Sequence, residues 1–242
     1  MIASLVFWQL RPGGSRSPRV RGAATKRLEP IQRVVIDAGH GGNDSGAIHG
    51  GVSEKDLTLD VAQRLERLLQ AQGLKTTLTR ATDATMSLSN RAKIANREDD
   101  CVFVSIHFDE GSGAAAAGVQ TFFATRQVAR TSMLASWLPF LQPAATSGHS
   151  VESQSLAGFV QGALVARTQA IDRGTRAEQF YVVANVRHPA ILVEGGFLSN
   201  EAEMAKLTTP DYRQQLAAAI GDGIMRYRAL VNAPPATSQG TE

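Results

Sequence analysis

The chain has 242 residues, of which 43% are hydrophobic and 19% are charged. This length suits one α/β domain or two small ones, and the composition excludes a wholly disordered protein. The longest apolar run is far shorter than the roughly 18–20 residues that a membrane-spanning helix needs. Cys101 is the single cysteine, which excludes an internal disulfide, and its apolar neighbours predict a small buried side chain.

The formal net charge of +3 is concentrated near the N-terminus. Residues 1–30 carry six basic side chains and one acidic one, which leaves 19 basic and 21 acidic side chains for residues 31–242. A nucleic-acid-binding domain carries its basic surface on the fold itself, so the charge argues against nucleic acid as a partner. We expect 1–30 to be a basic leader, either disordered or a degraded export signal, and 233–242 to be a disordered polar tail.

Segments typical of strands and of helices alternate between these two ends. Strands are predicted where short β-branched or apolar runs stop at glycine or polar residues, and helices where apolar residues recur every three or four positions. In chain order we expect strand 33–38, helix 54–72, strand 75–80, helix 88–97, strands 101–108 and 119–125, helix 154–171, strand 190–193 and helix 211–231. This alternation predicts a single α/β domain over 31–232, with a mostly parallel twisted sheet of about six strands and helices on both faces.

Three of the predicted strands lead into side chains that can do chemistry. His40 follows the first strand, His107 ends the strand 101–108, and Glu194 follows the last strand. Glu54 opens the helix that comes after the first strand. Sites in such sheets lie outside the carboxyl ends of the strands, so these four side chains are expected to meet at one edge.

His40, Glu54 and His107 form a two-histidine, one-glutamate set. A catalytic zinc site uses three protein ligands of this kind and leaves a fourth position for water. Taken one at a time, His40 could be a turn residue and His107 a strand-end histidine with a local hydrogen bond. The three together favour a metal site.

Glu194 interrupts the apolar stretch 190–196, which otherwise has the composition of a buried strand. A carboxylate in such a place is costly unless it is paired or lies near a metal ion. The functional interpretation is a general base that takes a proton from water and passes it to a leaving amine. The alternative is a structural ion pair with Arg91 or Arg173.

Four motifs in order carry a resemblance to a known family: VVIDAGHGGNDSGA at 34–47, SEK at 53–55, VSIHFDE at 104–110 and ILVEGGFLSNEAE at 191–203. Over about residues 31–231 the chain resembles the zinc-dependent N-acetylmuramoyl-L-alanine amidases of the amidase 3 type, which are cell-wall hydrolases. The resemblance implies that His40, Glu54 and His107 hold one zinc ion per chain and that Glu194 is the catalytic glutamate.

The resemblance also implies a reaction and a location. The substrate bond is the amide between the lactyl group of N-acetylmuramic acid and the L-alanine of the stem peptide, in peptidoglycan or in a muropeptide, and its hydrolysis serves cell-wall remodelling or daughter-cell separation. Because this substrate lies outside the cytoplasm, we expect an extracytoplasmic protein, in the periplasm or the cell wall. We expect a monomer that is not stably inserted in the membrane.

Residues 126–152 resemble the family least, and we expect them to form an insertion at the rim of the active site. Some members of the family block the zinc with a helix inserted here, which a partner releases. Glu152 is the only acidic residue of this segment, so we expect a hydrophobic flap or a helix on which an activator protein docks, not a zinc plug. Phe108 stands where the family commonly has a small residue, and we expect it to narrow or reshape the substrate groove.

Other classes of protein fit the sequence less well. A nucleotide-binding turn starting at Gly39 would need glycine where Asp44 stands, and no Walker A lysine is present. A serine hydrolase would need a G-x-S-x-G motif, which the sequence lacks. A binding-only domain of the same fold would be indicated by loss of a ligand or of Glu194, and all four residues are present.

The remaining polar residues that we singled out receive structural interpretations. The three other histidines, His49, His149 and His188, are expected to be solvated or locally hydrogen-bonded. Asp37 and Asn200 are expected either to support the metal ligands or to cap an element.

Overall fold

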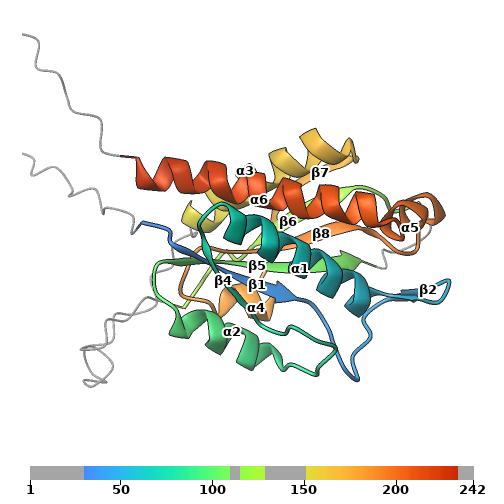
Figure 1. The fold of residues 1–242 in the computed structure, drawn as a ribbon, viewed down its shortest axis with the longest axis horizontal. Helices are drawn as coiled ribbons and strands as arrows, with labels where there is room; N and C mark the ends of the chain where they lie inside the picture. The colour runs from blue at the N-terminus through green and yellow to red at the C-terminus, as the bar shows by residue number, and fades with distance from the viewer. Residues whose placement is uncertain (1–29, 110–114, 129–150, 234–242) are drawn as a thin grey trace, which may run out of the picture.

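The computed structural model describes residues 30–109, 115–128 and 151–233 (Figure 1). Almost all of the predicted leader and tail, and all but the two ends of the segment 126–152, lie outside these residues. The strands are β1 (Arg33–Ala38), β2 (Ile48–His49), β3 (Val52–Ser53), β4 (Lys75–Leu78), β5 (Cys101–Asp109), β6 (Val119–Phe123), β7 (Asp172–Ala177) and β8 (Ala190–Phe197). The helices are α1 (Glu54–Ala71), α2 (Leu88–Arg97), α3 (Val151–Thr168), α4 (Tyr181–Ala184), α5 (Glu201–Leu207) and α6 (Pro210–Asn232). None of these helices is both long and apolar enough to cross a lipid bilayer.

Six of the strands form one sheet in the order β4-β1-β5-β8-β6-β7. All neighbouring strands run parallel except β6 and β8, which are antiparallel. β2 and β3 form a separate hairpin between β1 and α1. The prediction of one α/β domain with a mostly parallel sheet of about six strands is confirmed.

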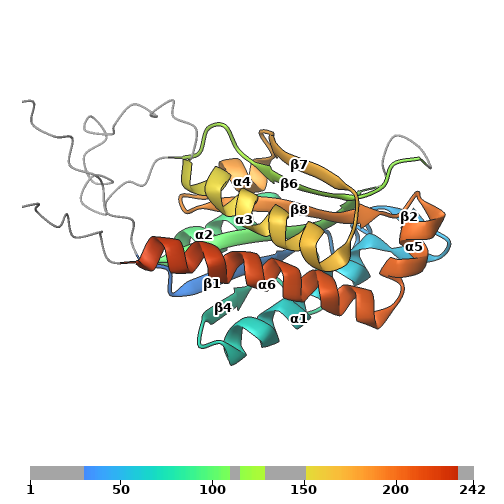
Figure 2. The same ribbon diagram turned by 90° about the horizontal axis from the view of Figure 1, so that it is seen from above.

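Helices cover both faces of the sheet. Successive residues of its central strands face opposite ways, so each strand contributes side chains to a core on either face. On one face Val34, Ile36 and Val104 pack in a core with α1, α3 and α6. On the other face Val35 and Phe103 pack in a second core with α2 and α4. Figures 1 and 2 show α6 lying along α1 and α3, with α2 and α4 across the sheet from them.

Every predicted helix and strand is present, with differences at the ends. β8 continues through Glu194 to Phe197, so Glu194 lies within the strand and not after it. The polar strand β7, the hairpin β2–β3 and the short helices α4 and α5 were not predicted. β7 is an edge strand with an exposed, charged sequence and a glycine, and it has none of the apolar alternation that marks a strand.

The start and the end of the domain are tied together. The backbone N–H of Ile31 donates to Asn232 Oδ1 over 3.0 Å, and Arg228 Nε donates to the carbonyl oxygen of Ile31 over 3.1 Å. The chain therefore enters β1 beside the point at which α6 ends.

Candidate active site

The cluster of functional side chains begins in the turn after β1. His40 adopts a left-handed backbone conformation with φ of 58°, which is rare for a residue that is not glycine. Gly41 and Gly42 also have positive φ, of 124° and 61°. This turn brings the His40 ring back over the carboxyl end of the sheet.

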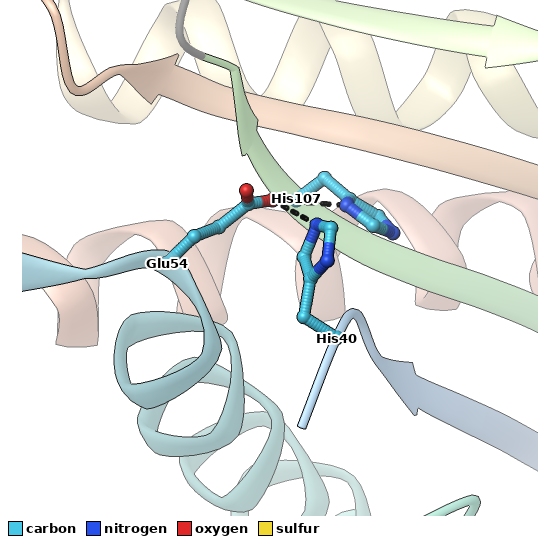
Figure 3. A group of neighbouring side chains, drawn as sticks. All are labelled: His40, Glu54 and His107. Carbon is cyan, nitrogen blue, oxygen red and sulfur yellow. Dashed lines mark hydrogen bonds and ion pairs between the residues drawn. The ribbon is translucent and has the colours of Figure 1, made fainter. Parts of the chain in front are cut away.

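Three side chains from three different elements converge here (Figure 3). Glu54 comes from the first residue of α1, His107 from β5 and His40 from the turn after β1. Glu54 Oε1 lies 3.1 Å from His40 Nε2 and 2.9 Å from His107 Nδ1. One candidate ligand atom from each residue can be chosen so that all three lie within 4.8 Å of one another. The three residues predicted to form one cluster therefore do so.

Two glycines leave room for these rings. A methyl group added to Gly39 would overlap the His107 ring, and one added to Gly46 would overlap the Glu54 carboxylate. Gly46 also has a φ of 63°, which an L side chain rarely adopts. Glycine is therefore required at both positions for the cluster to assemble.

The Glu54 carboxylate interacts with both histidines of the cluster and with two backbone N–H groups. Oε1 also accepts a hydrogen bond from the backbone N–H of Phe108 over 3.0 Å, and Oε2 accepts one from Ala47 over 3.0 Å. Burial alone would raise the pKa of Glu54, but the hydrogen bonds from His107 and His40 outweigh it, and the pKa lies far below its ordinary range. Glu54 is therefore ionised, as a metal ligand must be.

Asp44 is a participant that sequence reasoning missed. Its Oδ2 lies 2.9 Å from His40 Nδ1, and its Oδ1 accepts a hydrogen bond from the backbone N–H of Gly46. Burial lowers the pKa of His40, but Glu54 and Asp44 together outweigh it and raise the pKa. A carboxylate on the second ring nitrogen fixes the orientation of a metal-binding histidine.

Glu194 lies on the strand beside His107, because the register of β5 and β8 pairs these two residues. Its Oε2 is a buried atom without a hydrogen-bond partner among the described residues. Burial raises the pKa of Glu194 well above its ordinary value, and the charges of Glu54 and Asp109 raise it further, against a hydrogen bond from the backbone of Asp109.

The structural alternative for Glu194 is wrong. Arg91 instead pairs with Asp37, at 2.7 Å. The Arg173 guanidinium lies over the ring of Phe197, 4.7 Å from its centroid. Neither arginine pairs with Glu194, so among the described residues an ion pair does not account for this side chain in an apolar strand.

The donor set fits a metal ion. Two imidazole nitrogens and a carboxylate oxygen are the ligands of many catalytic zinc sites. Oε2 of Glu194, on the neighbouring strand, is buried and has no hydrogen-bond partner among the described residues, as expected of a group that acts on bound water or substrate. The residues present are therefore those that a hydrolytic zinc centre requires.

The prediction for Phe108 is wrong. Its side chain is fully buried in the core with α1, α3 and α6, and it would contact a methyl group placed on Gly195. Successive residues in a strand face opposite ways. His107 faces the site, so Phe108 points away from it into the core. Phe108 therefore cannot line a substrate groove.

The remaining singled-out residues mostly follow their predictions. Asn200 caps α5, where its Oδ1 accepts from two backbone N–H groups. Asp37 is buried and pairs with Arg91, and Cys101 is a buried thiol that donates to the carbonyl oxygen of Ala95. His188 is nearly buried and has a partner, and His149 lies outside the described residues.

The geometry defines an α/β domain with a candidate metal-binding cluster at the carboxyl edge of its sheet. Residues 34–226 match the Amidase_3 family model, described as N-acetylmuramoyl-L-alanine amidase, and the chain belongs to this family. It is an enzyme of the N-acetylmuramoyl-L-alanine amidase type.

Individual relatives agree with the family match. The germination-specific N-acetylmuramoyl-L-alanine amidase of Bacillus subtilis (strain 168) is 30% identical over 217 residues, which cover 84% of this chain and 82% of the relative. The crystal structure of N-acetylmuramoyl-L-alanine amidase from Clostridium difficile 630 is 32% identical with a TM-score of 0.69, over 82% of this chain and 97% of that one. The CwlD amidase from Clostridioides difficile, solved in complex with the GerS lipoprotein, is 27% identical with a TM-score of 0.69, over 82% of this chain and 99% of that one.

Proposed function

We propose that this amidase depends on zinc, that His40, Glu54 and His107 hold one ion per chain, and that Glu194 carries the proton during hydrolysis. One observation carries the proposal: a single oxygen of Glu54 lies within 3.1 Å of a ring nitrogen of each histidine, and Glu194, whose Oε2 is buried, lies beside His107 on the next strand. When bound, the ion would polarise the scissile carbonyl group and lower the pKa of the attacking water.

The residues around the cluster support metal binding. Asp44 Oδ2 lies 2.9 Å from His40 Nδ1. With its proton on Nδ1 and donated to Asp44, His40 would offer the lone pair of Nε2 to an ion on the side of Glu54. The ionised carboxylate of Glu54 balances part of the charge of a divalent cation. His107 points its Nδ1 to the same place from β5.

Glu194 is positioned to move a proton. In the proposed reaction it accepts a proton from the attacking water, whose oxygen forms a new bond to the lactyl carbonyl carbon. The carbon–nitrogen bond then breaks, and Glu194 returns the proton to the departing nitrogen of L-alanine. The products are a lactyl carboxylic acid, which releases its remaining proton to solvent, and a stem peptide with a free amino end, and no covalent enzyme intermediate is needed.

The substrate determines the expected location and partners. We expect the enzyme to act on peptidoglycan or released muropeptides, outside the cytoplasm, in the periplasm or cell wall. The similarity to CwlD, which is solved with the GerS lipoprotein, supports an activator protein as a partner of this chain. We keep the segment 126–152 as its expected docking site.

Mass analysis of digested peptidoglycan tests the proposal directly. The enzyme should release stem peptides with free L-alanine amino groups, and a chelator should stop their release until zinc is added back. Zinc binding without any such product would indicate a binding-only domain. Product formed at the same rate in the presence of chelator would contradict zinc dependence.

A further inference from the structure

Two buried arginines lie directly beneath the cluster. Arg80 and Arg91 are each only 3% exposed, and the carboxylate of Asp37, which pairs with Arg91, is fully buried. Burial and the charge of Arg91 lower the pKa of Arg80. Placing two guanidinium groups beside one buried carboxylate is costly, so their contacts must compensate for the lost hydration.

Those contacts are concentrated on the backbone that carries His40. Arg91 donates to the carbonyl oxygens of Ala38 and His40. Arg80 donates to the carbonyl oxygen of Ala38 over 2.9 Å and to that of Gly39 over 2.8 Å. Three consecutive carbonyl groups are thus held by two guanidinium groups, at the turn where His40 takes its left-handed conformation.

The same network reaches the elements that carry the other two candidate ligands. Arg80 Nη2 also donates to the carbonyl oxygen of Lys55, over 2.8 Å, and to Thr58 Oγ1, over 3.0 Å, in the first turns of the helix that Glu54 opens. Asp37 accepts from Arg91 over 2.7 Å and from Ser105 over 2.8 Å, two residues before His107 on β5.

We propose that Arg80 and Arg91 are positioning residues of the metal centre, which hold the backbone of His40, the start of α1 and β5 in the relative placement that metal binding needs. This inference rests on the proposed zinc site at His40, Glu54 and His107. Neither arginine touches the candidate ligand atoms, so each acts through the segment that carries a ligand. Removal of such supporting contacts typically weakens metal affinity by about 10- to 100-fold.

The test measures zinc affinity on Arg80→Lys and Arg91→Lys. Lysine keeps the positive charge but cannot reproduce the planar fork that holds two or more carbonyl groups. We expect the zinc dissociation constant, measured by competition with a chromophoric chelator, to rise by about 10- to 100-fold in each variant. The absorption spectrum of the Co²⁺-substituted protein should change as well, because the ligand geometry changes.

Arg213→Lys is the matched control. Arg213 is also a largely buried arginine that binds a carboxylate and a backbone carbonyl group, those of Asp60 and Leu207, but it lies on α6. Its replacement should leave zinc affinity and the Co²⁺ spectrum as in the parent. If Arg213→Lys weakens zinc as much as the two test variants do, the effect is general destabilisation and the inference is wrong.

A milder pair of variants covers the case in which a test variant does not fold. Thr58→Val removes the hydroxyl that donates to the carbonyl oxygen of Gly39 over 2.8 Å and accepts from Arg80. Thr168→Val removes a similar hydroxyl, bonded to the carbonyl oxygen of Leu164 on α3. Only Thr58→Val should weaken zinc binding, and equal affinities in the two variants would overturn the inference.

The parent and His40→Ala separate this inference from the proposed function. If His40→Ala binds zinc as tightly as the parent, the proposed zinc site itself is wrong. If His40→Ala loses zinc while Arg80→Lys and Arg91→Lys bind it like the parent, the site stands and the positioning role is wrong.

Discussion

Glu194 gives the sharpest test at the scale of single residues. Glu194→Gln keeps the shape of the side chain and removes its capacity to exchange a proton, so turnover should fall by at least about 10²-fold. Zinc content should stay at one per chain, because Glu194 is assigned to proton transfer and not to metal binding. Both quantities can be measured on the same preparation.

Glu98→Gln is the matched control for this variant. Glu98 follows α2 and pairs with Arg33 at the opposite end of β1 from the cluster. Its replacement should change turnover little. Near-normal activity in Glu194→Gln would remove its catalytic role, and loss of zinc would make Glu194 a ligand.

The sequence predicted some residues of the candidate site and missed others. His40, His107 and Glu194 could be placed together because each lies near the carboxyl end of a strand, where parallel sheets gather their sites. Asp44 was missed because its contact with His40 depends on the exact course of a glycine-rich turn, which no periodicity describes. The error at Phe108 was avoidable, since period-two alternation already turns it away from His107.

At the scale of elements, Asp60 links α1 to α6. It accepts hydrogen bonds from Arg64 on its own helix and from Arg213 on α6. Burial raises the pKa of Asp60, but these two arginines outweigh it and lower the pKa below its ordinary value. The pairing therefore stabilises the fold above the unfolded-state pKa of about 3.9, and this contribution is lost as the pH falls through the lower folded-state pKa.

Asp60→Asn should accordingly lower the Tm at pH 7, by about 2–4 °C if the pairing contributes about 1 kcal/mol. The difference from the parent should shrink as the pH is lowered below about 4. Thermal unfolding followed by circular dichroism at several pH values measures both effects. Asp99→Asn, at an exposed turn, is the control, and a Tm difference that stays constant down to pH 2 would contradict the assignment.

The residues that flank 129–150 lie close together near the start of β8. Ser153 Oγ donates to Gln127 Oε1 over 2.8 Å and accepts from the backbone N–H of Ala190 at the start of β8. These flanking residues therefore lie at the start of β8, four residues before Glu194. Placement of the insertion at the rim of the site stays a prediction, because residues 129–150 lie outside the described part of the chain.

Deleting 129–150 and bridging the gap with a short glycine–serine linker tests the role of the segment. The domain should fold, because the flanking residues are already hydrogen-bonded. Hydrolysis of a soluble muropeptide should change little, while activity on polymeric peptidoglycan or activation by a partner should fall. A large rise in the rate on muropeptide would show that the segment is autoinhibitory.

The elements differ in how far they could be predicted. The buried strands and the amphipathic helices were predicted because burial imposes a periodic apolar pattern on them. β7 and α4 escaped because one is a polar edge strand and the other spans a single turn.

At the scale of the whole molecule, the proposed metal site lies at the carboxyl end of the sheet and not in the apolar cores. The two apolar cores on the faces of the sheet are formed without the candidate ligands. Chelation should therefore abolish hydrolysis while the far-ultraviolet circular dichroism stays near that of the native protein. Loss of secondary structure on metal removal would contradict this prediction, and re-addition of zinc to recover activity is the control.

The hydrogen bonds that join Ile31 to α6 hold the start of the domain next to its end. Domains with adjacent ends tolerate circular permutation and insertion into a host protein. A chain that starts at residue 151, joins 233 to 30 through a short linker and ends at 128 should fold with the same sheet order. Its zinc affinity should match that of the parent without residues 129–150, and a much weaker affinity would show that the native chain order is needed. If the permutant binds zinc normally, the sheet and its candidate ligands can be presented from new termini near the start of β8. Those termini are a practical attachment point for a wall-binding module or a probe.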